Sequence, residues 1–240
     1  TGKIDRNCLA GEITQVLIEF LEVAINSIVF LKGIYPPGAF ERHRYMNVAV
    51  QRARHPQLHE YIHFAVSSLR PFLQKVKELG GPKWETSKKA RQGPFLFDRN
   101  IGRETRKKKG EGFKGLVERV VVIFYNKDHV PAEKFVFKLS FNQSSNLGES
   151  TGLGFALRSF LVKLSVAEPV TRALPVDCRW EITAYFHSLP CVENDSKEAQ
   201  MWVPTDTKHW QHPPIITPIK SMNSELMNLQ LYLEHPQPTE

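Results

Sequence analysis

Two short motifs in the sequence contain residue types that carry out catalysis in other proteins. The first is His59-Glu60-Tyr61-Ile62-His63, in which two histidines lie four residues apart and a glutamate follows the first. On a helix this spacing places both imidazoles on one face, where they could bind zinc while the glutamate activates a zinc-bound water. The pattern therefore raises the hypothesis of a zinc metalloprotease.

The residues around this motif argue against a metal site. The extended form of the motif needs a glycine and a third histidine at positions where this chain has Val66 and Leu69. His59 and His63 also lie on the flank of the apolar stripe expected for this helix, and a basic segment follows where a third ligand would be needed. We expect two solvated histidines and no metal, with the protease as a remote alternative.

The second motif is Gly148-Glu149-Ser150-Thr151-Gly152, which matches the G-x-S-x-G nucleophile elbow of hydrolases. In that elbow a strand runs directly into the serine, whereas the polar run 142–146 precedes it here. We therefore expect a loop and a helix start, with Ser150 or Thr151 as the capping residue. The sequence also lacks the glycine-rich motifs that bind nucleotide phosphates, so we expect neither a catalytic residue nor a cofactor.

The positive charge of the chain is concentrated in one segment. The 240 residues carry a formal charge of +7, and the stretch 83–111 contains ten Lys or Arg against four Asp or Glu, which accounts for +6. We expect residues 83–115 to form an exposed, disordered insertion, with one small apolar island at Phe95-Leu96-Phe97. Such basic patches suit nuclear localisation or non-specific contact with nucleic acid, or they are simply solvated.

Other features favour an intracellular protein. The start of the chain lacks the apolar run of a secretory signal, and the apolar stretch Val16–Leu31 contains two glutamates that would be costly inside a bilayer. Cys8, Cys178 and Cys191 are scattered and have neither zinc-ligand nor disulfide-framework spacing.

Hydrophobic periodicity predicts helices alternating with antiparallel strands. The expected helices are Gly11–Lys32, a segment from Pro56 to the Gly80-Gly81-Pro82 turn, and Leu153–Val166 with Phe155, Phe160, Leu161 and Leu164 facing inward. The expected strands are Tyr45–Gln51, Val117–Tyr125, Lys134–Leu139, Cys178–Phe186 and short pieces at Met201–Val203, Ile215–Ile216 and Leu229–Leu233. This order predicts an α+β fold with helices layered on a sheet.

Several segments, taken in order, resemble the HORMA-domain accessory subunit of translesion DNA polymerase zeta. They are Glu19–Ala24, Tyr35–Phe40, Asn47–Gln51, His55–Ile62, Glu133–Phe137, Arg158–Val166, Pro218–Met222 and Gln230–Tyr232. The resemblance implies a single HORMA domain over 1–240, with three helices packed on an antiparallel sheet. It also implies that residues 189–240 form a mobile safety belt.

The resemblance further implies a non-catalytic adaptor that acts in the nucleus, in translesion DNA synthesis and the DNA damage response. In that family the belt closes over a proline-containing peptide of the polymerase's catalytic subunit. By position, Tyr61 and Trp202 look like the aromatic peptide contacts, although Tyr61 would equally suit core packing. The alternative within the same fold is a spindle-checkpoint or meiotic HORMA adaptor, since a fold does not fix its partner.

Two further surfaces come with the resemblance. Ile216, Gln230 and Tyr232 correspond to the family surface that binds the C-terminal domain of a scaffold translesion polymerase. Arg158 corresponds to the helix position used for HORMA self-association, in a homodimer or a heterodimer, although a solvated helix arginine would look the same.

Overall fold

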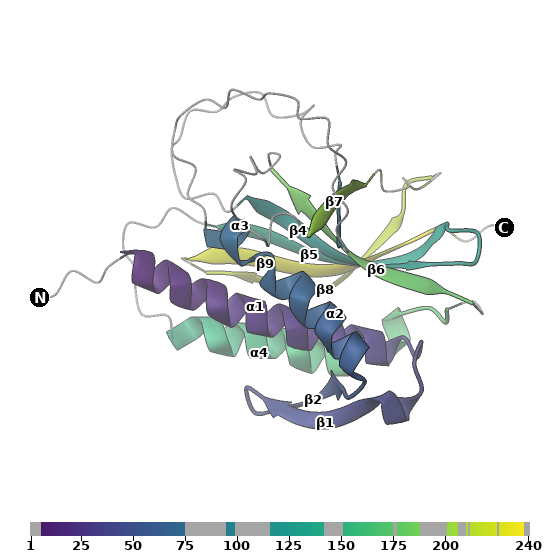
Figure 1. Cartoon of the computed structure of the whole chain (residues 1–240), viewed down its shortest axis with the longest axis horizontal. Coiled ribbons are helices and arrows are strands. Elements are labelled where there is room, and N and C mark those ends of the chain that lie inside the picture. The colour runs from purple at the N-terminus through teal and green to yellow at the C-terminus, as the bar shows by residue number, and fades with distance from the viewer. Residues whose placement is uncertain are drawn as a thin grey trace, which may run out of the picture.

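The structure is a computed structural model, and it describes residues 6–74, 95–98, 116–141, 151–174, 177–187, 201–205, 210, 212–224 and 226–237. Residues 6–10 and 95–98, together with Gln74, Thr151 and Pro204, are described by their backbone alone. Helices cover one face of a seven-stranded sheet (Figure 1). The α+β architecture predicted from the sequence is therefore confirmed.

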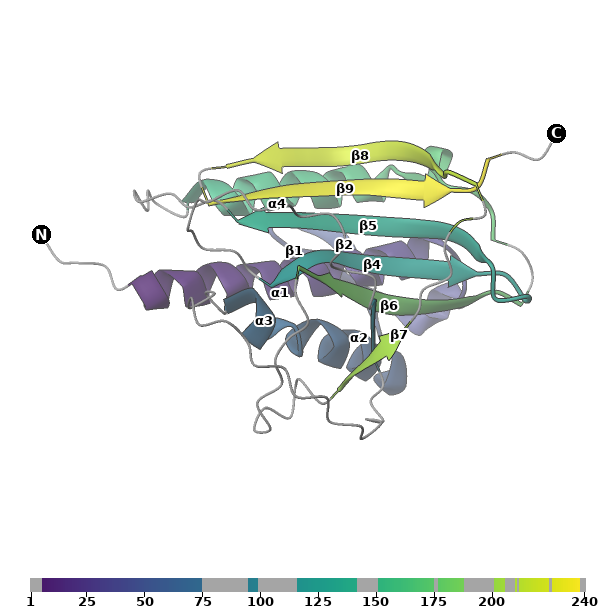
Figure 2. The same cartoon turned by 90° about the horizontal axis from the view of Figure 1, so that it is seen from above.

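The strand order of the sheet is β7-β3-β6-β4-β5-β9-β8 (Figure 2). The bounds are β3 Phe95–Asp98, β4 Val117–Tyr125, β5 Pro131–Phe141, β6 Arg179–Phe186, β7 Trp202–Thr205, β8 Ile215–Asn223 and β9 Met227–His235. The pairs from β6 through to β8 are antiparallel, whereas β3 runs parallel to both β6 and β7. The C-terminal strands thus lie at both margins of the sheet, with β7 at one margin and the β8–β9 hairpin at the other.

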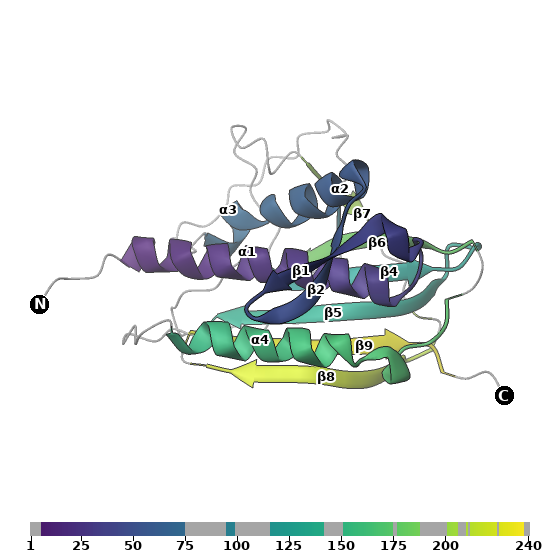
Figure 3. The same ribbon diagram turned by 90° about the horizontal axis from the view of Figure 1, so that it is seen from below.

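The helical layer consists of α1 between α2 and α4, with a separate two-stranded hairpin beside them (Figure 3). Its elements are α1 Arg6–Leu31, η1 Pro37–Ala39, β1 Phe40–Tyr45, β2 Val48–Ala53, α2 Pro56–Ser67, α3 Arg70–Gln74, α4 Thr151–Ser165 and η2 Glu168–Val170. The expected second helix is divided into α2 and α3 just before Pro71, and its predicted end at 80–82 lies outside the described residues.

The prediction of one strand over Tyr45–Gln51 is wrong, because this segment contains the turn of the β1–β2 hairpin. Met46 and Asn47 have φ values of +47° and +59°, and Tyr45 pairs with Val48 across them. Two consecutive positive φ angles are typical of the tight turns whose twist matches that of a hairpin.

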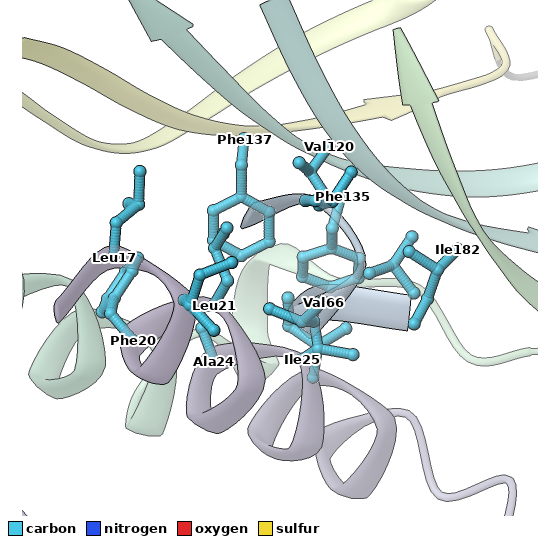
Figure 4. Packing of buried hydrophobic residues seen from close by; sticks show 14 of the residues in the cluster. Leu17, Phe20, Leu21, Ala24, Ile25, Val66, Val120, Phe135, Phe137 and Ile182 are labelled. Atoms are coloured by element: carbon cyan, nitrogen blue, oxygen red, sulfur yellow. The ribbon is translucent and has the colours of Figure 1, made fainter. Parts of the chain in front are cut away.

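The core lies between α1 and the sheet. Figure 4 shows Leu21 and Phe20 of α1 directed toward Phe135 and Phe137 of β5. The Phe20 ring meets that of Phe137 edge-on at 6.2 Å between centroids, and all four side chains are fully buried. By length and composition, residues Gly11–Leu31 could cross a membrane, but 61% of the tested window is buried inside the protein, as in the core helix of a folded domain.

Helix α4 buries one face and exposes an apolar stripe on the other. Its buried residues are Leu153, Leu157, Phe160, Leu161 and Leu164. The prediction that Phe155 faces inward is wrong, because its side chain is 76% exposed. At about 100° per residue, position 155 is rotated by roughly 140° from position 160, which places it on the opposite face.

Candidate functional site

The margin of the sheet at β6 contains a position one strand wide, enclosed on both sides. One edge of β6 pairs with β4, and the other pairs with β3, with Leu96 opposite Thr183. Strand β7 then pairs with the outer edge of β3, with Leu96 opposite Val203. We call this position, between β6 and β7, the strand groove.

Tyr61 of α2 lies on the β6 side of the strand groove. Its hydroxyl oxygen accepts a hydrogen bond from the backbone N–H of Ile182 in β6 over 3.2 Å. Its ring packs edge-on against Trp180 at 5.4 Å between centroids. Burial raises the pKa of Tyr61 to about 12, so the phenol is protonated at neutral pH. Because the Ile182 N–H points to Tyr61 and away from β4, strand alternation directs the Ala184 N–H to the same edge.

Trp202 of β7 lies on the other side of the strand groove, where it pairs with Phe95. Its side chain is 3% exposed, and its indole Nε1 donates a hydrogen bond to Ser68 Oγ over 2.9 Å. The ring also meets that of Phe186 edge-on at 6.3 Å between centroids. Trp202 therefore belongs to a strand anchored in the core, in agreement with the short strand expected at Met201–Val203.

The second predicted surface lies at the far margin, on the sheet face opposite the helices. Gln230 and Tyr232 alternate in β9 with leucines that face the core, and Tyr232 packs with Val136 on this outer face. Ile216 of β8 lies opposite Glu234, and Glu234 alternates along β9 on the same face as Gln230 and Tyr232. The Ile216 side chain is 59% exposed. The three residues predicted to bind a scaffold polymerase are thus on one face of one hairpin.

Arg158 lies on the exposed face of α4. Phe155 precedes it by three residues and Val162 follows it by four, so all three side chains occupy neighbouring turns of one face. Val162 is 46% exposed, which makes the surroundings of the arginine apolar. Arginine and aromatic residues such as Phe155 are enriched at protein interfaces.

The two histidines of the HExxH motif contact other side chains. His63 Nδ1 lies 2.9 Å from Glu22 Oε2, and His59 Nε2 lies 3.3 Å from an Arg52 guanidinium nitrogen. Among the described residues, no three His, Cys, Asp or Glu side chains are grouped so that they could hold a metal ion. The serine of the G-x-S-x-G motif lies outside the described residues, as does the basic segment 83–111 apart from residues 95–98.

A buried polar cluster at the end of β9 did not emerge from the sequence patterns. Lys32, which directly follows α1, forms an ion pair with Glu133 of β5, and both side chains are 1% exposed. The backbone N–H of Arg172 donates to Glu133 Oε1 over 3.1 Å, and His235 Nδ1 lies 4.0 Å from the same oxygen. The Arg172 side chain donates to the Pro236 carbonyl oxygen over 3.1 Å. The cluster connects the helical layer to the C-terminal hairpin.

One signal of this cluster was present in the sequence. Glu133, Phe135 and Phe137 are alternate residues of β5, so their side chains lie on the same face of the strand. Glu133 is therefore a carboxylate on the face that packs against the core. His235 has the same relation to Leu233 in β9. A charged group in the period-2 pattern of a buried face requires a partner, because an unpaired buried charge is costly.

Strand β3 also differs from the sequence expectation. The insertion 83–115 was expected to be exposed throughout, but its residues 95–98 form a strand paired on both edges. The apolar island within the basic segment supplies this strand. The rest of the insertion lies outside the described residues.

Solved structures with this arrangement define the fold class. One chain of the crystal structure of the mitotic checkpoint complex matches with a TM-score of 0.65 at 14% identity, over 94% of this chain and 99% of that one. C. elegans HTP-2 bound to the HIM-3 closure motif matches with a TM-score of 0.58 at 8% identity, over 94% and 91%. The fold is that of a HORMA domain.

Sequence similarity narrows the class to a family. The chain is 50% identical over 228 residues to the DNA polymerase zeta processivity subunit of Arabidopsis thaliana, which covers 95% of this chain and 87% of that protein. It is 29% identical over 234 residues to the mitotic spindle assembly checkpoint protein MAD2B of Rattus norvegicus, covering 92% and 90%. No family model matches the chain. The chain belongs to the family of HORMA-domain accessory subunits of DNA polymerase zeta, and the resemblance found in its sequence is confirmed.

Proposed function

We propose that this protein is a non-catalytic adaptor that holds a proline-containing peptide of the catalytic subunit of DNA polymerase zeta in the strand groove. It acts in translesion synthesis and the DNA damage response in the nucleus. The observation that carries the proposal is the enclosure of one strand position between β6 and β7. An extended peptide there would pair its backbone on both sides, as in peptide recognition by strand addition.

The covering strand supplies a physical reason for slow release. A peptide paired only with β6 could leave sideways, whereas one that also pairs with β7 can leave only after β7 separates. Affinity differences between related complexes arise chiefly from the dissociation rate. The anchoring of Trp202 on Ser68 favours the closed position of β7, so it contributes to retention of the peptide.

The aromatic residues at the groove are suited to contact the partner. Tyr61 and Trp202 lie at opposite sides of the strand groove, on α2 and β7. Large aromatic residues supply much of the binding energy at peptide interfaces. Prolines of the partner cannot donate to a ladder, so they occupy positions that flank the paired residues.

A scaffold translesion polymerase would bind at the opposite margin, through Ile216, Gln230 and Tyr232. Strands β4 and β5 lie between β6 and β9 in the sheet, so the two margins are separated by roughly 14 Å at the usual strand spacing. Both partners can therefore bind at once, which is the requirement for a bridge. Arg158 lies on the exposed face of α4, away from both of these sites. We propose that it contacts a second HORMA domain in self-association.

The test uses overlapping peptides that tile the catalytic subunit, with binding to the full chain measured by fluorescence anisotropy. We expect binding of a proline-containing segment, weakened at least tenfold by Tyr61→Ala. Tyr125→Phe is the control, because Tyr125 lies on the opposite sheet face, where its hydroxyl donates to Glu181 over 2.5 Å. Absence of binding to every tile, or binding only to peptides of checkpoint or meiotic proteins, would reject the proposal.

A further inference from the structure

The strand groove is occupied by the chain itself. Strand β3 comes from the insertion between α3 and β4, and it lies between β6 and β7 where the proposed partner peptide would pair. We propose that residues Phe95–Asp98 are a tethered internal occupant of the strand groove, which a partner peptide must displace. This inference rests on the proposed function.

The topology distinguishes β3 from the framework of the sheet. The next strand along the chain, β4, pairs with the opposite edge of β6, so β3 is separated from its sequence neighbour by β6. It runs parallel to both of its own neighbours, whereas the five strands from β6 to β8 are mutually antiparallel. A short strand inserted in this way resembles a bound peptide more than a member of a meander.

The sequence of the occupant fits the same position. Phe95-Leu96-Phe97 is the longest apolar run of the basic segment 83–111, and Pro94 precedes it. Aromatic residues are enriched in strands, and a proline biases the residue before it to an extended backbone. The segment thus offers the groove the chemistry proposed for the partner, an extended peptide that contains a proline.

The tether makes such an occupant effective although it is short. A segment attached at both ends has an effective concentration on the order of millimolar at its own site. The apparent dissociation constant of a partner equals its intrinsic dissociation constant divided by the fraction of molecules whose groove is open. A four-residue strand makes few pairs, so a longer peptide can displace it. The occupant also covers the edge of β6, which would otherwise offer unpaired backbone groups to other chains.

A disulfide trap tests whether β3 occupies the groove in solution. Leu96→Cys and Thr183→Cys lie in register, and they are introduced after the three native cysteines are replaced by serine. Leu96→Cys with Ala184→Cys is the control, because adjacent strand positions face opposite sides of the sheet. We expect an intramolecular cross-link for the first pair that abolishes peptide binding until it is reduced.

A proline pair tests the competition. Leu96→Pro with Phe97→Pro removes two pairing N–H groups from β3, and we expect it to lower the apparent dissociation constant of the partner peptide on the order of tenfold. Thr86→Pro with Ser87→Pro is the matched control, since it adds two prolines to the same insertion outside β3, and we expect no change.

The outcomes separate this inference from the proposed function. Equal peptide affinity for the wild type and the Leu96/Phe97 proline pair, without a cross-link at 96–183, would overturn the internal occupant while the adaptor stands. Full peptide binding to the cross-linked protein, or a cross-link between two copies, would also overturn it. If the cross-link forms but no variant binds any peptide, the occupancy of the groove is supported and the proposed function fails.

Discussion

The hydrogen bond from Trp202 Nε1 to Ser68 Oγ connects strand β7 to the C-terminal end of α2 over 2.9 Å. We predict that Ser68→Ala lowers the free energy of unfolding by about 1–3 kcal/mol, because it leaves a buried indole N–H without this acceptor. The same change should speed dissociation of a bound partner peptide, since β7 separates more often. Ser67→Ala is the control, because its hydroxyl is exposed. An unchanged dissociation rate in Ser68→Ala would contradict the role of β7 as a cover.

Because Lys32 and Glu133 form a buried ion pair, we predict that the effects of replacing them on the free energy of unfolding are not additive. Lys32→Met should cost about 3–5 kcal/mol in denaturant unfolding, because it leaves the Glu133 carboxylate buried without its cationic partner. Lys32→Met with Glu133→Leu should recover most of this loss, since it removes both charges. Equal destabilisation by the single and the double substitution would show that the pair is not energetically coupled.

His235 predicts a loss of stability on mild acidification. Burial lowers the pKa of this imidazole below 6.5, and the nearby Arg172 and Lys32 lower it further, while Glu133 opposes the shift. The unfolded chain therefore binds the proton more readily, so the stabilisation is present above about pH 6.5 and is lost as the pH falls through the folded-state pKa. We expect the wild type to lose more stability than His235→Gln between about pH 7 and pH 5, measured by thermal unfolding. Parallel pH profiles of the two proteins would refute this.

The outer face of the β8–β9 hairpin predicts separable partner sites. Ile216→Asp places a charge in the exposed apolar position opposite Glu234, and we expect it to weaken binding of the scaffold polymerase domain at least tenfold in calorimetry. Binding of the catalytic-subunit peptide should not change, because the strand groove lies at the other margin. Asn223→Asp, at the exposed end of β8, is the charge-matched control. Equal loss of both partners in Ile216→Asp would indicate a disturbed fold.

The exposed face of α4 predicts self-association through Arg158. Arg158→Ala should shift the protein toward the monomer in sedimentation velocity, because it removes the charged centre of the stripe formed with Phe155 and Val162. Lys163→Ala tests charge alone, since this exposed lysine lies on the same helix. A wild type that is monomeric at every concentration would rule out this contact.

Periodicity predicted most of the fold, because most elements bury one regular face. The expected strand over Cys178–Phe186 is β6, and its alternate residues Ile182, Ala184 and Phe186 are buried on one side. The predicted inward orientation of Phe155 is wrong because the hydrophobicity of a residue does not give its angle around the helix axis. Periodicity also treats each element alone, so it carries no information about which edge of the sheet receives a distant strand.

The candidate site was less accessible to sequence reasoning for the same reason. Tyr61 and Trp202 could be selected from the family resemblance, but the partners that position them, Ile182 and Ser68, lie 121 and 134 residues away. The pairing of Phe95–Asp98 with β6 and β7 joins segments that are far apart in the sequence. Such long-range pairings follow from tertiary packing, which outweighs local preference in short strands.

The central claim, that a peptide of the catalytic subunit pairs with the edge of β6 opposite β4, is tested most directly by amide hydrogen exchange at Ala184. The experiment uses the Leu96→Pro, Phe97→Pro protein, in which β3 no longer pairs, with and without the peptide. Thr183, whose N–H faces β4 by strand alternation, is the internal control. The account predicts that the peptide slows exchange at Ala184 strongly and leaves the β8–β9 hairpin unchanged. Unaltered exchange at Ala184 with the peptide bound, or new protection confined to β8–β9, would contradict it.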